Sequence, residues 1–306
     1  MESAPPQSSF LILGPTAVGK SAFAVSVAER CGGEIVSADA FQVYAGLDGL
    51  TAKPSPDLLA RVPHHLVGEV PLTESWDVAR WLALAQKRIG EIHRRGRVPI
   101  IVGGTGLYIR ALTRGLAELP PASPALRTEL GLRPLTDLQR QLVELDSESA
   151  SRIDLHNPRR VIRALEVCLL TGRPFSSFRE QWPGTPSGWR GITLSRDRDE
   201  LYVRIDARTR EMFASGVIEE VRRLPAIGAT ASQTLGLREI RAHLAGEIAE
   251  AECLAAIQQA TRRYAKRQLT WFRRETDFRD VSLSTSADVE GLAELISSEV
   301  LCENRK

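Results

Sequence analysis

The stretch that decides the fold of this chain reads Gly14-Pro15-Thr16-Ala17-Val18-Gly19-Lys20-Ser21. It fits the phosphate-binding loop G-x-x-x-x-G-K-[ST], follows an apolar run at 10–13 and precedes an apolar-periodic segment at 22–31. In such a loop, backbone N–H groups and the N-terminus of the next helix face a phosphate. We therefore expect these eight residues to bind phosphate, with Lys20 neutralising its charge and Ser21 ligating Mg²⁺. A chance Gly-rich turn is the alternative, but strand, motif and helix occur in the required order.

Further apolar runs and periodic segments predict an α/β fold. The runs at 34–37 and 98–102 are typical of buried parallel strands, and the segment 75–95 has the spacing of a helix that ends near Gly96. Alternating strands and helices form a mostly parallel sheet covered by helices. We predict a core like that of P-loop NTPases, with a parallel sheet flanked by helices.

A change of composition at 119–124, where the sequence reads LPPASP, predicts a second domain. The segment that follows lacks strand signals, and Asn157-Pro158 is typical of a helix start. That helix continues to Thr171-Gly172, after which a Gly- and Pro-rich passage at 182–191 leads to an apolar run at 192–194. We predict a helical insertion domain at 117–190 within a catalytic core of 1–116 and 191–306. Further core elements are expected as helices at 199–224, 236–244, 250–274 and 288–301, and as a strand at 281–283.

The composition is that of an ordinary globular protein. Of the 306 residues, 43% are hydrophobic and 25% are charged, and 40 Lys and Arg stand against 38 Asp and Glu. Any surface for nucleic acid must therefore be local. The 4 cysteines lack the paired spacing of a zinc or redox site. Residues 1–9 lack a signal-peptide pattern and no apolar run is long enough to span a membrane, so we expect a cytoplasmic protein with no membrane partner.

Two polar residues follow predicted strands. Asp39 comes after the run at 34–37, and Thr105 follows the run at 98–102. The carboxyl ends of strands in open α/β sheets are where ligands bind. Asp39 could hold magnesium through water, accept a proton from a nucleophile, or cap the next turn, and the local pattern does not separate these roles. Thr105 could donate its hydroxyl to a substrate, although a cap of the following helix is the simpler interpretation.

Basic residues gather in two segments. The segment 261–274 holds six basic residues and no acid, and on a helix Arg263 shares a face with Arg267. The missing acids and the interleaved aromatic residues favour contact with phosphate or nucleic acid over a solvated face. A smaller cluster at 159–163 could flank the same bound backbone. Arg222 could bind a diphosphate bidentately, although taken alone it is more simply a surface residue.

Taken in order, eight stretches resemble one family, the bacterial tRNA dimethylallyltransferases, also called tRNA isopentenyltransferases or IPP transferases. The stretches are GPTAVGKS (14–21), SADAFQVY (37–44), TAKP (51–54), HHL (64–66), GGTGLYI (103–109), NPRRVIRALEV (157–167), SGVIEEVRRL (215–224) and TRRYAKRQLTWFRR (261–274). The resemblance covers nearly the whole chain. Eight stretches in family order are far more specific than a phosphate loop alone.

The resemblance implies transfer of a dimethylallyl group from dimethylallyl diphosphate to the exocyclic amine of an adenosine beside the tRNA anticodon. It implies that Asp39 is the general base, and that Thr16, Lys20 and Arg222 contact the leaving diphosphate with Mg²⁺ as cofactor. The target base would leave its stack to react. The residues implied to contact the tRNA anticodon stem-loop are Asp39, Ala40, Phe41, Gln42, Thr105, Arg127, Arg159, Arg160, Val161, Ile162, Arg163, Arg263 and Arg267. We expect the chain to act as a monomer.

Three residues depart from the pattern that the resemblance implies. Ala40 stands where the family commonly has a small hydroxyl residue, Leu50 replaces a Gly-type residue, and Leu237 replaces Tyr. They affect the expected fine contacts to tRNA, whereas the residues expected at the phosphate are intact. The C-terminal zinc finger of eukaryotic relatives has no counterpart in the cysteine pattern.

Two other protein classes explain part of the sequence. A small-molecule or nucleotide kinase would use the same loop for ATP, but it has no need of a long basic helix with aromatic residues. A nucleic-acid-binding protein without catalysis would leave Lys20, Ser21 and Asp39 without a role. The transferase accounts for all of these features.

Overall fold

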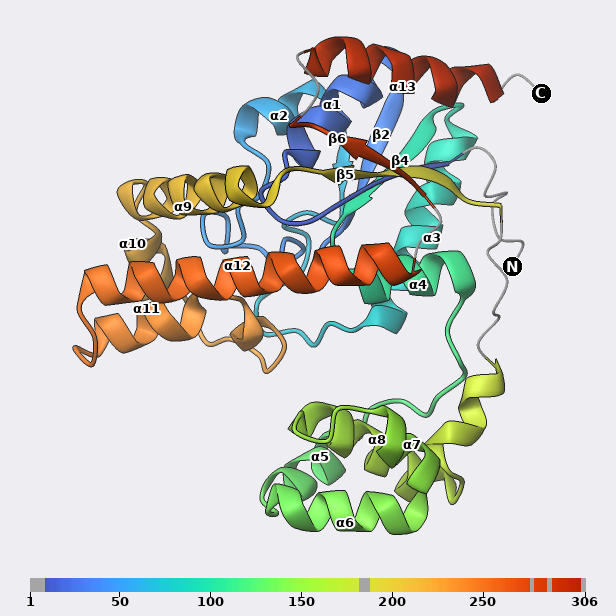
Figure 1. Cartoon of the computed structure of the whole chain (residues 1–306), viewed down its shortest axis with the longest axis vertical. Coiled ribbons are helices and arrows are strands. Elements are labelled where there is room, and N and C mark those ends of the chain that lie inside the picture. Colours follow the sequence, from blue (N-terminus) through green and yellow to red (C-terminus); the bar gives the residue numbers. More distant parts are fainter. Residues whose placement is uncertain (1–8, 182–187, 276–277, 285–287, 304–306) are drawn as a thin grey trace. The chain divides into compact units, whose positions relative to one another are not determined.

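The structure is a computed structural model that describes residues 9–181, 188–275, 278–284 and 288–303 (Figure 1). The chain divides into two compact units. Unit 1 comprises Met1–Thr113 and Pro186–Lys306, and unit 2 comprises Arg114–Thr185. Two expectations, for the N-terminal residues 1–8 and for residues 182–187 of the Gly- and Pro-rich passage, lie outside the described residues.

Unit 1 is built on a parallel sheet. Its described strands are β1 (Phe10–Leu13), β2 (Gly33–Ala38), β3 (His64–His65), β4 (Val98–Gly103), β5 (Arg190–Ser195) and β6 (Arg279–Ser282). They form one 6-stranded sheet in the order β3-β2-β4-β1-β5-β6, and each neighbouring pair is parallel. The prediction of an α/β fold with a parallel sheet is confirmed.

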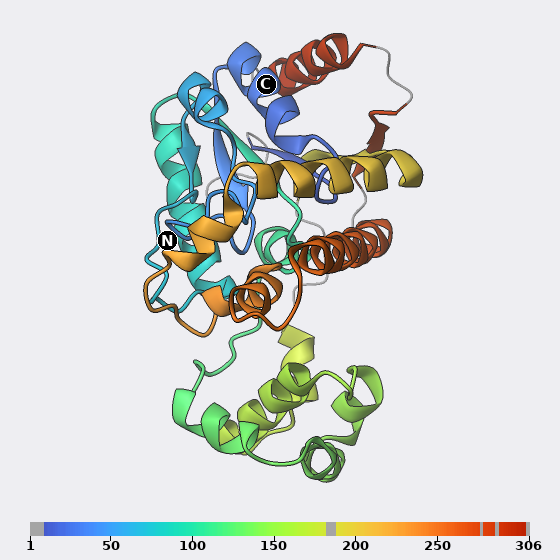
Figure 2. The same ribbon diagram turned by 90° about the vertical axis from the view of Figure 1, so that its left-hand side faces the viewer.

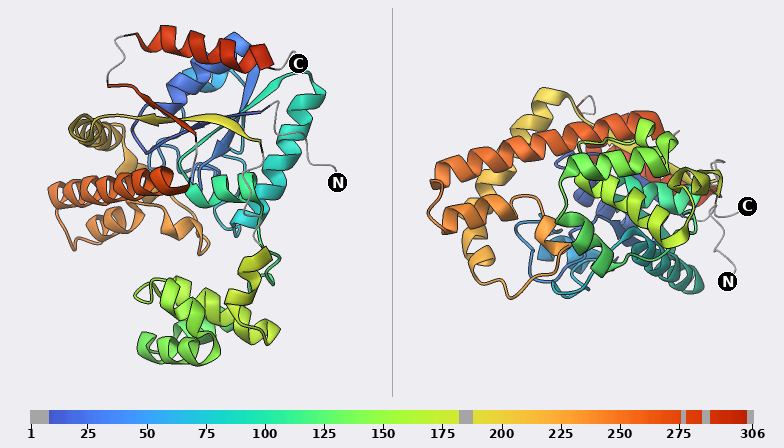
Figure 3. Two further views of the ribbon diagram at one scale, coloured as in Figure 1. Left: turned by 45° about the vertical axis from the view of Figure 1, so that its right-hand side comes forward. Right: turned by 90° about the horizontal axis from the view of Figure 1, so that it is seen from below.

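Helices cover both faces of this sheet (Figures 1 and 3). Side chains alternate along β1, so that Phe10 and Ile12 pack in one core while Leu11 and Leu13 pack in the other. The first core includes residues of α1 and α13, and the second includes residues of α3, α4, α11 and α12. The helices in or starting in unit 1 are α1 (Lys20–Cys31), α2 (Pro56–Arg61), α3 (Val78–Arg94), α4 (Gly106–Arg114), α9 (Arg198–Ala214), α10 (Val217–Arg222), η3 (Ala231–Gln233, a 3-10 helix), α11 (Leu237–Leu244), α12 (Glu250–Glu275) and α13 (Val289–Glu303).

The predicted helix at 199–224 is interrupted. The structure has two helices here, α9 and α10, which are separated at Ser215 and Gly216. Gly216 has φ 89°, a left-handed conformation that side chains with a Cβ rarely adopt and that ends a regular helix. Because the chain turns at this glycine, α10 does not continue the face of α9.

Two glycines shape the turn between β1 and α1. Gly14 has φ 148°, and a Cβ at this position would lie 2.6 Å from the carbonyl oxygen of Leu194 on the neighbouring strand β5. Gly19 caps α1 with φ 109°. The loop can therefore pass close to the sheet and deliver the first amides of α1 to the sheet edge.

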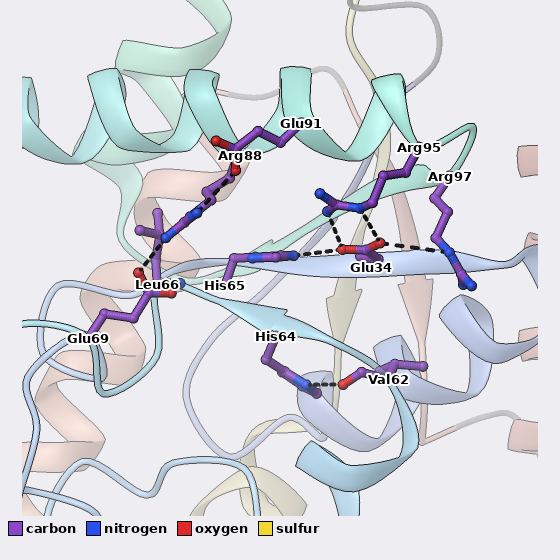
Figure 4. Close-up of polar contacts among 10 residues, drawn as sticks. All are labelled: Glu34, Val62, His64, His65, Leu66, Glu69, Arg88, Glu91, Arg95 and Arg97. Atoms are coloured by element: carbon purple, nitrogen blue, oxygen red, sulfur yellow. Dashed lines mark hydrogen bonds and ion pairs between the residues drawn. The ribbon is translucent and has the colours of Figure 1, made fainter.

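A buried carboxylate lies near the opposite end of β2 (Figure 4). Glu34 is 3% exposed and accepts hydrogen bonds from Arg95, through Nε at 3.1 Å and Nη2 at 2.7 Å, and pairs with His65 Nε2 at 2.7 Å. Burial alone would raise the pKa of Glu34, but the contacts with Arg95 and His65 outweigh it and hold the pKa below its usual value. This ion cluster ties the edge strand β3, which carries His65, to the loop after α3.

Unit 2 is helical in its described part. Its elements are α5 (Pro124–Gly131), α6 (Leu135–Leu145), α7 (Ser147–Arg152), α8 (Pro158–Thr171) and the 3-10 helix η2 (Phe175–Gln181). Asn157 caps α8 through its side chain, Pro158 occupies the first turn, and Gly172 ends the helix with φ 65°. The helix start and end predicted from these residues are confirmed. Leucines of α5, α6 and α8 form the core of this unit.

None of the helices within the described ranges is both long and apolar enough to cross a membrane.

Candidate active site

A cavity of about 810 Å³ lies at the carboxyl edge of the sheet in unit 1. The phosphate loop contributes Thr16, Lys20 and Ser21 to its lining, and Asp39 follows β2 on the same edge. Sequence reasoning expected these residues at one sheet edge, and the structure brings them together. Arg204 and Arg208, which lie outside the stretches that carry the resemblance, also line this cavity.

The phosphate loop offers the positive charge of Lys20 and the first amides of α1 to the cavity. Lys20 Nζ donates to the carbonyl oxygen of Pro15 at 2.6 Å, and the amides of Lys20 and Ser21 open the helix, where the first turn has no internal acceptor. Burial lowers the pKa of Lys20 to about 7; the Asp39 carboxylate opposes this shift, and Arg208 reinforces it. The site therefore favours an anion that restores the charge on Lys20.

Three arginines, two on α9 and one just before it, donate hydrogen bonds to the phosphate loop. Arg208 Nη2 donates to Thr16 Oγ1 at 2.7 Å, Arg204 Nε to the carbonyl oxygen of Ala17 at 2.9 Å, and Arg196 Nε to that of Val18 at 2.8 Å. Arg208 Nε is buried and has no hydrogen-bond partner among the described residues. A buried donor of this kind beside a phosphate loop is suited to an anionic ligand.

Arg222 lies elsewhere. It is the last residue of α10, its side chain is 58% exposed, and it forms an ion pair with Glu219 one turn away. Among the described residues that line the cavity, α9 supplies Arg204 and Arg208, whereas Arg222 is not included. The expectation that Arg222 contacts the diphosphate therefore has no structural support, because the break at Gly216 takes α10 off the face of α9. The spacing of Arg204 and Arg208, one turn apart on a predicted helix, was the sequence signal that could have identified them.

The structure shows one of the roles considered for Asp39, the cap of the next turn. Its Oδ1 accepts hydrogen bonds from the amides of Phe41 at 2.9 Å and Gln42 at 3.3 Å, which is the turn cap. Within the described chain, Oδ2 accepts no hydrogen bond. Oδ2 is thus available to a ligand while Oδ1 fixes the orientation of the carboxylate.

Of the residues after Asp39, Gln42 lines the cavity, whereas Ala40 packs against the core. Gln42 lines the cavity, but its Nε2 donates to the carbonyl oxygens of Thr51 at 3.3 Å and Ala52 at 3.1 Å, which holds the 51–54 stretch. Ala40 is half-buried against the core, and its amide donates to Thr105 Oγ1 at 3.1 Å. The hydroxyl of Thr105 therefore fixes the chain beside Asp39, a contact that the expectation of a helix cap did not foresee.

A small apolar pocket of about 70 Å³ adjoins the phosphate loop. Phe41, Leu50, Met212, Leu235 and Ile257 form its apolar side, and polar groups of Thr16, Asp39 and Arg208 also line it. The pocket can hold a short hydrocarbon chain beside a bound anion. Leu50, one of the departures from the family pattern, contributes to this apolar wall, and Leu237 is fully buried in the core.

Helix α12 presents one face to the core and another to solvent. It packs against α9 and α11 (Figures 2 and 3). Arg263 and Arg267 are exposed, and the Arg267 guanidinium lies 5.6 Å from the ring centre of Tyr264. Arg262 is committed to an ion pair with Asp206. The predicted basic face with Arg263 and Arg267 is therefore open to a partner.

The basic residues of unit 2 also separate into two groups. Arg127 and Arg163 both form ion pairs with the fully buried Glu166, at 2.9 Å and 2.5 Å. These contacts hold α5 to α8, and the hydrogen bonds lower the pKa of Glu166 despite its burial, which alone would raise it. Arg159 and Arg160, at the start of α8, are exposed.

Two residues of the same predicted cluster face the inside of unit 2. Val161 is fully buried, and Ile162 is partly buried against the same core. The Val161 side chain therefore offers no surface for the expected tRNA contact, because the helical period turns this position inward.

The residues at the loop fit a magnesium ion bound together with a phosphate. Ser21 is half-buried at the start of α1 and lines the same cavity as the carboxylates of Asp39 and Asp48. Mg²⁺ prefers hard oxygen ligands and keeps several waters when it binds phosphates. Within the described residues no cluster of three or more His, Cys, Asp or Glu could hold a metal by itself, so the phosphate would supply ligands.

The sequence matches two family models. The model described as "IPP transferase" matches residues 42–275, and the one described as "Isopentenyl transferase" matches residues 7–74. Among curated proteins, the tRNA dimethylallyltransferase of Caulobacter sp. (strain K31) is 45% identical over 276 residues, which is 87% of this chain and 89% of the relative. That of Geobacter sulfurreducens is 44% identical over 291 residues, or 91% and 93%.

Solved structures resemble the fold over nearly its full length. The full-length tRNA isopentenylpyrophosphate transferase of Bacillus halodurans has a TM-score of 0.71 and 34% identity, and the alignment covers 97% of this chain and 98% of that one. A eukaryotic dimethylallyltransferase acting on tRNA has a TM-score of 0.79 at 23% identity over 95% of this chain and 77% of that one, a likeness in fold.

Proposed function

Because the chain belongs to the IPP transferase family, the tRNA dimethylallyltransferases, we propose that the cavity at its phosphate loop is the place of reaction. The enzyme is a tRNA dimethylallyltransferase, which prenylates adenosine 37 of tRNA with dimethylallyl diphosphate as donor. The roles of individual residues in this reaction are our proposal. One observation supports them most: a phosphate loop, an arginine with a buried Nε, a pocket with an apolar side and a carboxylate adjoin one another.

The donor would lie with its diphosphate on the phosphate loop and its five-carbon chain in the small apolar pocket. The amides of Lys20 and Ser21, the ammonium of Lys20 and the guanidinium of Arg208 face the diphosphate. The C1–O bond breaks with its electron pair on the diphosphate, so negative charge grows where these donors are fixed in advance. When bound at Ser21, magnesium would neutralise part of this charge.

Asp39 would take the proton of the acceptor. As the exocyclic N6 forms its bond to C1, the nitrogen must lose one proton, and the carboxylate Oδ2 can accept it. Oδ1 stays in the turn cap with Phe41 and Gln42, so the base keeps one orientation during the reaction. Thr105 accepts a hydrogen bond from the amide of Ala40 and so fixes the backbone next to the Asp39 carboxylate.

The tRNA would contact both units. We assign the exposed Arg263 and Arg267 of α12 and the exposed Arg159 and Arg160 of α8 to its phosphates. Unit 2 thus serves as the helical domain that binds the anticodon stem-loop, and unit 1 as the catalytic core. Since the substrate is a tRNA, we propose that the enzyme works in the cytoplasm, as a monomer.

One experiment tests the function. The protein is incubated with Mg²⁺, carbon-labelled dimethylallyl diphosphate and a tRNA whose anticodon is followed by adenosine, and a tRNA with guanosine at that position is the control. We expect label only in the adenosine tRNA. Unlabelled tRNA together with consumption of added ATP would refute the transferase and indicate a kinase instead.

A further inference from the structure

Three side chains on one face of α12 meet three consecutive residues of the loop after β4. Gln268 Nε2 donates to the carbonyl oxygen of Gly104 at 2.8 Å, and Tyr264 is hydrogen-bonded with the Thr105 side chain. Trp271 covers Gly106 so closely that a Cβ there would lie 2.4 Å from the indole. The positions 264, 268 and 271 share a face of a helix. Each of the residues 104, 105 and 106 is therefore in contact with a different side chain of α12.

Gln268 also reaches the phosphate loop. Its Oε1 accepts a hydrogen bond from the amide of Thr16 at 2.9 Å, so one buried carboxamide bridges Thr16 and Gly104. The side chain is 5% exposed. The fit leaves no free space, because a Cβ on Gly104 would lie 2.3 Å from Gln268 Nε2 and 2.9 Å from the carbonyl oxygen of Gly14.

The bridge decides which groups are free to bind a ligand. Because the Thr16 amide is bound to Gln268, that amide does not donate to a diphosphate, whereas the Thr16 hydroxyl lies against Arg208. The carboxamide uses its acceptor on one loop and its donor on the other. Both contacts need a side chain that carries a hydrogen-bond donor and an acceptor at the same time, so a carboxylate, an ammonium or a guanidinium cannot make both.

We propose that Gln268 is a positioning residue of the transfer reaction, which sets the separation between the phosphate loop and the loop that carries Thr105. This rests on the proposed function, in which the first loop holds the diphosphate and the second supports Asp39 through Ala40. The N6–C1 bond forms while the C1–O bond breaks, so attacking nitrogen, C1 and leaving oxygen must lie in line. Gln268 lines the same cavity, but both polar atoms of its carboxamide are bonded to Thr16 and Gly104, so it acts on the reaction through these two residues.

The same helix carries the residues that we assign to tRNA. Arg263 and Arg267 lie on the exposed side of α12, within two turns of Gln268 on its buried side. Gln268 thereby joins the phosphate loop to the helix that we assign to tRNA binding. In this proposal, α12 and the sheet together set the position of the phosphate loop relative to the acceptor.

Two variants separate the parts of the bridge. Gln268→Leu removes both hydrogen bonds at similar volume, and Gln268→Glu keeps an acceptor for the Thr16 amide but loses the donor to Gly104. Gln258→Leu is the matched control, since Gln258 lies on the same helix, is half-buried, and donates to the carbonyl oxygen of Asp206 at 3.3 Å. The measurements are the single-turnover rate with both substrates saturating, the Kd of each substrate, and the Tm.

We expect both Gln268 variants to lower the single-turnover rate about tenfold to a hundredfold, the effect of a misplacement near 1 Å. The Kd values for dimethylallyl diphosphate and tRNA should change less than about threefold, because the carboxamide of Gln268 is already bonded to Thr16 and Gly104. The Tm should match that of Gln258→Leu within a few degrees. The control should keep the wild-type rate. Should Gln268→Leu fail to fold, the isosteric Gln268→Glu decides.

Three results would overturn the proposal: unchanged rates in both variants, a weaker Kd for dimethylallyl diphosphate with an unchanged rate at saturation, or a rate that falls only together with the Tm and both affinities. Wild-type protein that transfers no label would instead refute the proposed function, and would remove this role with it.

Discussion

The arginine that faces the diphosphate can be identified by comparing two substitutions. The structure places Arg208 against Thr16 of the phosphate loop, whereas Arg222 is exposed and paired with Glu219 on its own helix. We predict that Arg208→Ala strongly impairs transfer and that Arg222→Ala does not. The two arginines lie on successive helices and carry the same charge, so each is the control of the other.

The magnitude follows from the contacts. Arg208 donates to Thr16 Oγ1 at 2.7 Å and keeps a second, buried donor at Nε without a partner in the described residues. Removing one preorganised donor to a developing oxyanion costs about 2.7 to 4 kcal/mol, or about a hundredfold to a thousandfold in rate. Arg208→Lys retains the charge but not the planar fork, so we expect a smaller loss of about tenfold. Arg222→Ala should stay within about twofold of the wild type, because its side chain is largely solvated.

The assay is kcat/KM for dimethylallyl diphosphate at saturating tRNA, together with the Tm of each variant. A normal Tm with the expected loss for Arg208→Ala would locate the defect in the reaction. If Arg222→Ala were the impaired variant and Arg208→Ala retained full activity, the assignment of the diphosphate site would be wrong.

Three further predictions concern the base, the lysine and the basic helix. Asp39→Asn keeps an oxygen for the turn cap but removes the carboxylate that would accept the proton. The single-turnover rate of transfer should therefore fall about a hundredfold or more, with an unchanged Kd for dimethylallyl diphosphate. A weaker Kd with a normal rate would assign Asp39 to binding. Because burial lowers the pKa of Lys20 to about 7 and a bound diphosphate raises it, binding above pH 7 should take up a proton and weaken as the pH rises. Calorimetry at pH 8 in buffers of different ionisation enthalpy measures this uptake, and its absence would contradict the role of Lys20. The double variant Arg263→Ala with Arg267→Ala should reduce the slope of log Kd for tRNA against log salt by about 1.4 to 1.8. The control Arg262→Ala loses the ion pair with Asp206 and should leave this slope unchanged. Equal slopes for the two variants would exclude phosphate contacts at Arg263 and Arg267.

Local patterns in the sequence were enough for much of the fold. A few neighbouring residues determine the phosphate loop between β1 and α1 and the capped start of α8. The structure has both elements where they were predicted. Strand β3 was missed, because two histidines carry no strand pattern and pair with β2 only through the folded sheet. The break at Gly216 was missed because the apolar period continues across it.

The site was harder to predict wherever a partner is distant in the sequence. Arg127 and Arg163 belong to a basic pattern, but the buried Glu166 binds them both. Arg208 lies outside the stretches that carried the resemblance, and its contact with Thr16 arises only when α9 packs beside the loop. Gln268 is one polar residue among basic neighbours until the structure places it between Thr16 and Gly104. Motifs predicted the chemistry, and packing points to the side chains that we propose for it.

The central claim is that the phosphate loop holds a leaving diphosphate and does not transfer a phosphoryl group. Dimethylallyl diphosphate with ¹⁸O in the bridge between C1 and phosphorus tests it directly, with mass spectrometry of the products after reaction with tRNA. We predict that the label stays entirely in the released diphosphate, because the C1–O bond breaks while the prenyl group moves to tRNA. Label retained in dimethylallyl alcohol or in dimethylallyl monophosphate, together with phosphorylated tRNA, would mean that a phosphorus–oxygen bond breaks, and it would contradict this account.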